Sequence, residues 1–128
     1  MCIDYCIVVG DTRLSDGGYG ILSRQVSKLH SLTPYTILGT SGMTSDMITL
    51  QKVLDHRLIQ YAQKHNKIAS TDSISQLLSN TLYYKRFFPY YTFNLLAGID
   101  KDGKGCVFGY DAIGSFEKLT YGAEGRSW

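Results

Sequence analysis

Apolar residues recur along the chain with two different periods, and these periods predict its secondary structure. Between residues 45 and 64 they return every three or four positions, which predicts one face of an α-helix. The residues of that face are Met47, Leu50, Leu54, Leu58 and Tyr61. A second helix is predicted to begin with the capping-box pattern Ser73-x-x-Gln76 and to stop before Pro89. Its apolar face consists of Ile74, Leu77, Leu78, Thr81 and Leu82.

Shorter apolar stretches on either side of the two helices predict β-strands. Residues 4–10 contain the β-branched run Ile7-Val8-Val9, which is typical of a buried strand. The turn residues of 100–105 separate two further apolar runs and predict a hairpin loop. The remaining strands are predicted at residues 21–25, 28–32, 35–39, 92–99, 106–111 and 116–121.

Two amphipathic helices bracketed by hairpins predict an α+β layered fold. The helices must lie on one face of an antiparallel sheet, so the other face of that sheet also needs cover. We expect a second sheet to supply it, with some of the cover lying outside this chain. No repeat or linker divides the sequence, and we therefore treat residues 1–128 as a single domain.

Composition and charge argue against several classes of partner. The 128 residues are 44% hydrophobic and carry a net charge of +2, so we expect neither a nucleic acid nor a membrane as partner. We also expect no signal peptide and no membrane-spanning segment, because no apolar stretch is long enough. The cysteines at positions 2, 6 and 106 lack metal-ligand spacing, which predicts a reducing compartment and no metal or other cofactor.

The strand predicted at residues 4–10 stops at the charged sequence Asp11-Thr12-Arg13. Burying a charge is costly unless the charge is paired, so we interpret Asp11 and Arg13 as a structural ion pair. The alternative is a solvated turn at the end of the strand. The three histidines are scattered and none neighbours a serine or cysteine, so they predict no catalytic arrangement.

Several segments resemble, in order along the chain, those of proteasome β-type subunits. They are residues 10–15, 39–42, 84–91, 97–100 and 103–105. The aromatic tract of residues 84–91 and the Gly103-Lys104-Gly105 turn are most similar to the β subunits of the sixth position in the ring. The resemblance implies the αββα sandwich of the N-terminal nucleophile hydrolases, here truncated at both ends.

Active members of this family use an N-terminal threonine that is assisted by an aspartate, a lysine and a serine. The resemblance places Asp11 at the family's aspartate, Lys28 at its lysine and Gly42 at the glycine that lines the oxyanion site. The strand that carries the threonine is missing ahead of residue 4, and Arg126 falls near the place of the serine. We therefore expect the three matching positions to be vestigial and the chain to be non-catalytic.

The function that the resemblance implies is architectural. The chain would hold a position in the β ring of the 20S proteasome core, beside other α and β subunits that form a stacked ring complex. That complex degrades proteins in an ATP- and ubiquitin-dependent manner in the cytoplasm and nucleus. Two alternatives remain open: an N-terminal nucleophile hydrolase that uses Cys2, and a free-standing binding module that reuses the fold.

A dense aromatic cluster follows the second predicted helix, at Phe87, Phe88, Tyr90 and Tyr91. Some of these side chains must pack at the corner between the helix and the next strand. Four aromatic residues are hard to bury at one corner of a small domain, and aromatic residues are enriched in interface cores. We therefore assign Phe87, Phe88, Tyr90 and Tyr91 to an interface and expect at least one of the two tyrosines to face a neighbouring subunit.

Overall fold

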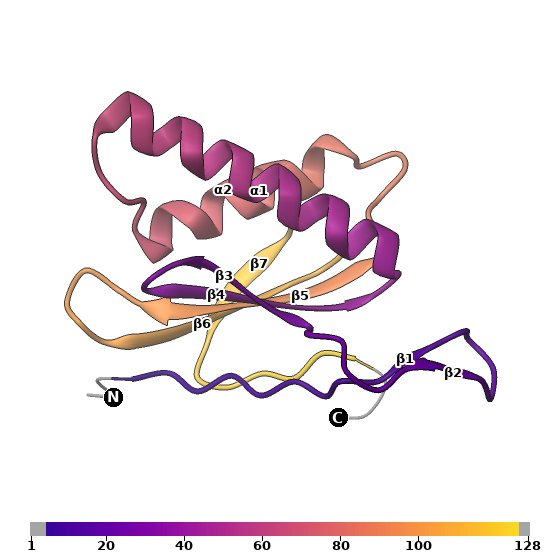
Figure 1. The fold of residues 1–128 in the computed structure, drawn as a ribbon. Helices are drawn as coiled ribbons and strands as arrows, with labels where there is room; N and C mark the ends of the chain where they lie inside the picture. Colours follow the sequence, from indigo (N-terminus) through magenta and orange to yellow (C-terminus); the bar gives the residue numbers. More distant parts are fainter. Residues whose placement is uncertain (1–4, 126–128) are drawn as a thin grey trace.

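Five antiparallel strands form a sheet in the computed structural model, which describes residues 5–125 (Figure 1). The sheet has the order β3-β4-β5-β6-β7, so each strand pairs with the next one along the chain. The strands are β3 (Leu29–Thr33), β4 (Thr36–Gly42), β5 (Thr92–Ile99), β6 (Gly105–Tyr110) and β7 (Phe116–Leu119). A separate small hairpin of β1 (Leu14–Ser15) and β2 (Ile21–Ser23) extends beyond one end of this sheet (Figure 1).

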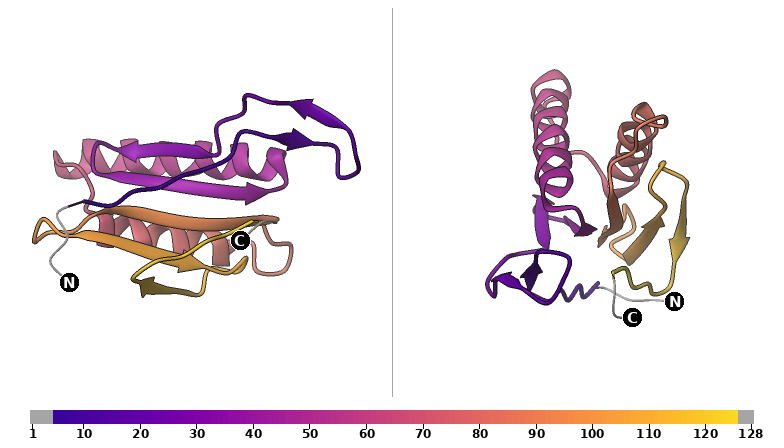
Figure 2. Two further views of the ribbon diagram at one scale, coloured as in Figure 1. Left: turned by 90° about the horizontal axis from the view of Figure 1, so that it is seen from below. Right: turned by 90° about the vertical axis from the view of Figure 1, so that its right-hand side faces the viewer.

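Both helices lie on the same face of the sheet (Figure 2). Helix α1 (Thr44–His65) packs against β3 and β4, and helix α2 (Thr71–Tyr84) packs against β5. The bounds of α1 agree with the predicted range to within one residue. The prediction that α2 opens at Ser73 is wrong, because the Ser70 hydroxyl accepts the Ser73 backbone N–H at 3.2 Å and caps the helix.

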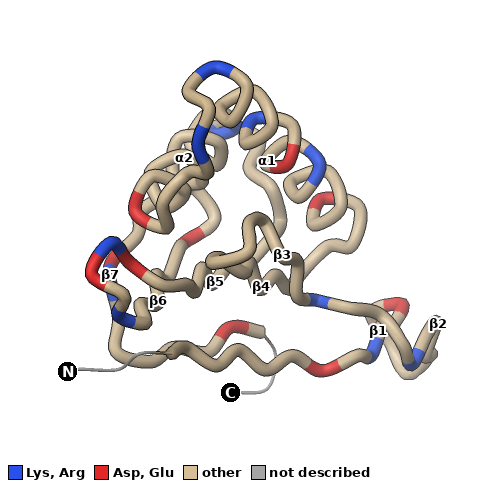
Figure 3. Tube along the Cα trace, turned by 60° about the vertical axis from the view of Figure 1, so that its left-hand side comes forward, with Lys and Arg blue, Asp and Glu red and all other residues tan. Residues whose placement is uncertain are grey.

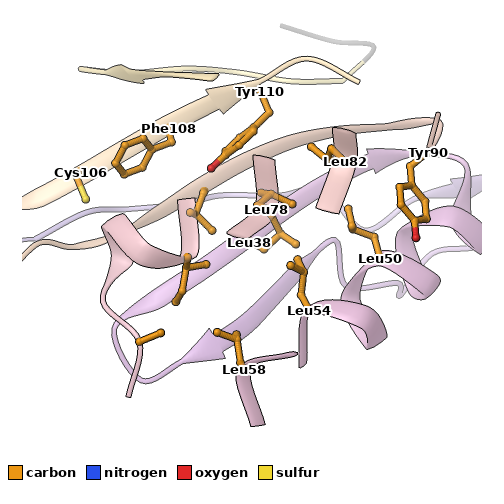
Figure 4. Packing of buried hydrophobic residues seen from close by; sticks show 13 residues of the cluster. Leu38, Leu50, Leu54, Leu58, Leu78, Leu82, Tyr90, Cys106, Phe108 and Tyr110 are labelled. Carbon is orange, nitrogen blue, oxygen red and sulfur yellow. The ribbon is translucent and has the colours of Figure 1, made fainter. Parts of the chain in front are cut away.

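The core lies between the helices and the sheet, as the helical periodicity predicts. Alternate residues of β4 and β6 point toward the helices, and the i, i+4 positions of α1 and α2 point back toward the strands (Figure 4). Its largest fully buried apolar side chains are Leu38, Leu50, Leu54, Ile74, Leu78, Leu82 and Leu96. Phe108 and Tyr110 extend this core along β6, where Tyr110 stacks on Phe116.

The buried side chain of Tyr110 extends from β6 to α2, where its hydroxyl donates to the Ser75 carbonyl oxygen at 2.7 Å. Burial raises the pKa of this phenol well above its usual value. The neutral form is therefore favoured in the folded chain, and its contribution to stability is complete below the unfolded pKa of about 10. That contribution is lost as the pH rises above this value.

We expect Tyr110→Phe to lower the free energy of unfolding by about 1 kcal/mol at pH 8, because the buried hydrogen bond is lost. Above pH 10 the stability of the wild type should fall faster than that of the variant. Urea unfolding at pH values from 8 to 11 measures both effects. Parallel stability curves across this range would show that Tyr110 ionises in the folded state as readily as in the unfolded state.

The opposite face of the sheet carries two extended segments in place of helices. Residues 5–10 run along it, and residues 120–125 lie beside them (Figures 1 and 2). Cys6 and Val8 line a shallow hollow with Ile37 and Ala97 of the sheet, whereas the side chains of Ile7 and Val9 are 74% and 87% exposed. This face is called the open face below.

The strand predicted at residues 4–10 is therefore wrong in two respects within the described residues 5–10. The segment is extended but has no strand pairing, and only alternate side chains are covered. The outward side chains of Ile7 and Val9 stay exposed because no layer of the described chain packs on them. The second sheet that we expected over the open face is not formed by residues 5–125.

Charged residues of both signs lie on the helical layer, on β7 and in the loops, whereas strands β1 to β6 contain no lysine, arginine, aspartate or glutamate (Figure 3). Within residues 5–125, no group of three histidine, cysteine or acidic side chains is placed to bind a metal ion. Neither helix of the described part is long and apolar enough to cross a membrane.

Candidate functional site

The two charged residues that the resemblance assigns to the active site lie in contact. The Lys28 ammonium nitrogen is 2.7 Å from a carboxylate oxygen of Asp11. Backbone contacts bring the two segments together, because the Val26 N–H donates to the Thr12 carbonyl oxygen at 3.0 Å. Gly10 also lies against Leu29, where a side chain at position 10 would be in van der Waals contact. The close approach at Gly10 and the backbone bond at Thr12 thus bring Asp11 within reach of Lys28.

The ion pair is largely open to solvent on the aspartate side. The Asp11 side chain is 69% exposed and that of Lys28 is 23% exposed. The hydrogen bond from Lys28 lowers the pKa of Asp11 below its usual value, and the backbone N–H of Arg13 contributes in the same direction. Asp11 is therefore a carboxylate at neutral pH, held by a lysine from a neighbouring segment.

The predicted ion pair between Asp11 and Arg13 is wrong. Among the described residues, the salt-bridge partner of Asp11 is Lys28, and Arg13 contributes only its backbone N–H, at 3.4 Å from a carboxylate oxygen. The reason is a local turn in which the short Asp11 side chain bonds to the backbone two residues later. That geometry leaves the second carboxylate oxygen directed to Lys28.

Asp11→Asn is expected to lower the free energy of unfolding by less than about 1 kcal/mol, the usual range for exposed ion pairs. Because the pKa of Asp11 is lowered in the folded chain, this contribution is present above the unfolded pKa of about 3.9 and is lost as the pH falls further. Urea unfolding at pH 7 and at pH 3, with Glu117→Gln as an exposed control, tests the expectation. A loss of about 3 kcal/mol or more at pH 7 would contradict it, since only a buried pair gives such a value.

Gly42 ends strand β4, and Met43 alone separates it from helix α1. Its φ of +115° lies in the region that favours glycine, and a Cβ at this position would overlap the carbonyl oxygen of Tyr91. The same oxygen accepts the N–H of Met43 at 2.8 Å. Two residues before Gly42, the Thr40 N–H donates to the carbonyl oxygen of Lys28 at 3.0 Å. Gly42 and Lys28 thus belong to the same end of the sheet.

The segment that precedes Asp11 runs away from this end of the sheet. Tyr5 lies against Gly105, where an added Cβ would overlap the Tyr5 carbonyl oxygen. Gly105 pairs with Ile99 at one end of β5, whereas Gly42 pairs with Thr92 at the other. Residues 5–10 therefore cover about 20 Å, at roughly 3.3 Å per residue. Cys2, the nucleophile of the alternative hypothesis, and Arg126 lie outside the described residues.

The aromatic cluster after α2 is divided between the core and the surface. Tyr90 is only 6% exposed and packs in the core, so it is wrong as a predicted interface residue. Phe87 is 96% exposed, and Phe88 and Tyr91 are also exposed. Tyr90 and Tyr91 are adjacent in an extended stretch, and neighbouring side chains of such a stretch point to opposite sides. One tyrosine is therefore buried and the other is open to solvent.

Sequence reasoning missed two further exposed aromatic residues, Tyr83 and Tyr84, at the end of α2. The sequence could have indicated their exposure, because their positions on the helix fall outside the apolar face made by Ile74, Leu78 and Leu82. It also missed a hollow of about 410 Å³ beside α1. This hollow is lined by apolar residues that include Leu32, Pro34, Leu58, Ile59 and Ile68.

Comparisons with known proteins agree with the resemblance seen in the sequence. The family described as "Proteasome subunit" matches residues 1–127. The chain is 56% identical over 122 residues to proteasome subunit beta type-1 of Arabidopsis thaliana, covering 95% of the chain and 54% of that protein. The protein of the same name from Dictyostelium discoideum is 55% identical, covering 95% of the chain and 52% of that protein.

An animal relative gives the same picture at lower identity. Proteasome subunit beta type-1 of Danio rerio is 44% identical over 124 residues, which is 97% of the chain and 52% of that protein. The chain thus spans about half the length of the curated relatives it matches. The family match covers nearly every residue, and the chain therefore belongs to the proteasome subunit family.

Proposed function

We propose that the chain is a non-catalytic, structural β-type subunit of the 20S proteasome core, similar to beta type-1. Its partners are then the other α and β subunits of a stacked ring complex, in the cytoplasm and nucleus. That complex carries out ATP- and ubiquitin-dependent protein degradation. The proposal rests on the family match and on the similarity to the relatives named beta type-1.

The layers of the fold support the αββα sandwich of the N-terminal nucleophile hydrolases. One sheet with two helices on one face is half of such a sandwich. The open face carries Ile7 and Val9 on an extended segment with their side chains directed away from the sheet. Apolar side chains in this position are suited to contact a second sheet, which residues 5–125 do not supply.

The path of residues 5–10 argues against the alternative in which Cys2 is the nucleophile. An N-terminal nucleophile must reach the aspartate and lysine at hydrogen-bond distance. Tyr5 lies about 20 Å from Asp11 along the extended segment. The three residues from Tyr5 to Cys2 reach at most about 11 Å, so a Cys2 thiol cannot return to the Asp11–Lys28 pair.

We expect the purified chain to show no cleavage of fluorogenic peptides, with or without Met1, and the same background for Cys2→Ala. Turnover that disappears in Cys2→Ala would contradict the proposal and favour the N-terminal nucleophile alternative. In cells, we expect the tagged chain to migrate with proteasome subunits in a very large complex on native gels. A small species that does not co-migrate with those subunits would instead favour the free-standing binding module.

A further inference from the structure

We propose that the exposed aromatic residues at the end of α2 dock an acidic, otherwise apolar segment of a neighbouring proteasome subunit. These residues, here called the aromatic corner, are Tyr83, Tyr84, Phe87, Phe88 and Tyr91. The identity of the partner as a proteasome subunit rests on the proposed function. The chemistry of the docked segment rests on the geometry and charge of the corner itself.

The corner is displayed by an ordered turn. Helix α2 ends at Tyr84, after which the Arg86 N–H donates to the Tyr83 carbonyl oxygen at 3.0 Å. The Phe88 N–H then donates to the Lys85 carbonyl oxygen at 3.2 Å. Farther on, the Tyr91 N–H donates to a carboxylate oxygen of Asp46 in α1. The backbone is thus tied to the helical layer, which holds the aromatic side chains in place for a partner.

The exposed aromatic surface is large enough to form the centre of an interface. An aromatic side chain buries about 150–250 Å² when it is covered. Three such side chains at Phe87, Phe88 and Tyr91 would bury on the order of 500 Å², compared with about 800 Å² per partner in a standard interface. Aromatic anchors of this kind dominate interface energetics.

Two cations give the corner its charge preference. The Lys85 ammonium nitrogen lies 4.5 Å from the centroid of the Tyr90 ring and 5.6 Å from that of the Phe88 ring. The Arg86 guanidinium lies 5.8 Å from the centroid of the Phe87 ring. Neither cation takes part in a salt bridge with another described residue. The turn thus combines exposed rings with two positive charges that lack a carboxylate partner in this part of the chain.

A segment that carries carboxylates beside apolar side chains complements this surface. The carboxylates would pair with Lys85 and Arg86, and the apolar side chains would cover the rings. A single-stranded nucleic acid could also stack on aromatic rings, but it needs a groove of cations that follows its backbone. Two cations and a net charge of +2 favour the protein segment.

Photo-crosslinking in the assembled complex tests the inference. The full chain is expressed with p-benzoylphenylalanine at position 87 beside the other subunits, and the large complex is isolated and irradiated. We expect a crosslinked peptide from another proteasome subunit with aspartate or glutamate next to apolar residues. A crosslink to RNA, to a segment without acidic residues, or to nothing would overturn the inference while leaving the proposed function intact. Failure of the wild-type chain to enter any large complex would overturn both.

Charge reversal supplies the second test. Lys85→Glu with Arg86→Glu should reduce the fraction of the chain in the complex about ten-fold, and Phe87→Ala with Phe88→Ala should do the same. The matched control is Lys64→Glu with Lys67→Glu, which reverses two exposed charges in the last turn of α1 and just after it. It should change that fraction by less than about two-fold. Equal effects of the two charge reversals would overturn the inference, because net charge alone would then explain the loss.

Discussion

Gly42→Ala should destabilise the chain by about 2–6 kcal/mol, and the upper end of this range approaches the whole stability of many small domains. Two penalties combine at this residue. The backbone has a φ of +115°, which a residue with a Cβ adopts only with strain. The new methyl group would also overlap the Tyr91 carbonyl oxygen and disturb the 2.8 Å hydrogen bond that this oxygen accepts from Met43.

Gly103→Ala is the matched control for this substitution. Gly103 has a φ of +77°, but no atom lies within 4 Å of a Cβ built there. The control therefore carries the conformational penalty alone, about 1–2 kcal/mol. Urea unfolding followed by circular dichroism compares the two variants. Equal losses of stability would mean that the end of β4 relaxes around the added methyl group, and that the approach of Tyr91 places little constraint on this strand.

Leu78→Ala should lower the free energy of unfolding by about 2–5 kcal/mol. Leu78 is fully buried among the side chains of α1, α2 and the sheet (Figure 4). The cost includes the lost transfer of the side chain from water and the cavity that remains. The cavity remains because both helices and the strands fix the surrounding wall.

The control for Leu78→Ala is Ile48→Ala, which removes an aliphatic side chain from the exposed side of α1. We expect this control to change the unfolding free energy by about 0.5 kcal/mol or less. Thermal unfolding gives the same ranking through the midpoint temperature. Similar losses in the two variants would show that the helical layer is loosely packed on the sheet.

Local periodicity was sufficient to predict most of the fold. The i, i+3 and i+4 positions of α1 predicted its face because that pattern depends only on residues of one element. The start of α2 was harder to predict, since Ser70-x-x-Ser73 and Ser73-x-x-Gln76 both offer a serine hydroxyl ahead of an apolar run. In the structure Ser70 is the cap, and the next residue, Thr71, donates its hydroxyl to the Ile99 carbonyl oxygen of the sheet, a contact between distant residues that no local pattern shows.

The candidate site was harder to predict than the helices, because it is formed by contacts between residues that are distant in the sequence. Local reasoning paired Asp11 with Arg13 because they are neighbours, whereas the structure pairs Asp11 with Lys28, 17 positions away. No periodic pattern encodes that distance, and only the family resemblance placed both residues at one site. The sequence also did not predict that Tyr90 is buried and Tyr91 exposed. The register of the following strand decides which of these two adjacent side chains points inward, and that register depends on distant residues.

The pairing of β4 with β5 sets the order in which the chain can fold during its synthesis. Gly42 pairs with Thr92, so residues 43–91 must leave the ribosome before the two strands can meet. At about 5–20 residues per second this takes roughly 2–10 s, during which β4 lacks its central partner. The β3–β4 hairpin and the two helices can form in that interval because their contacts are local. The nascent chain therefore exposes an unpaired strand edge for seconds, and this edge is an aggregation hazard until β5 has emerged to pair with it.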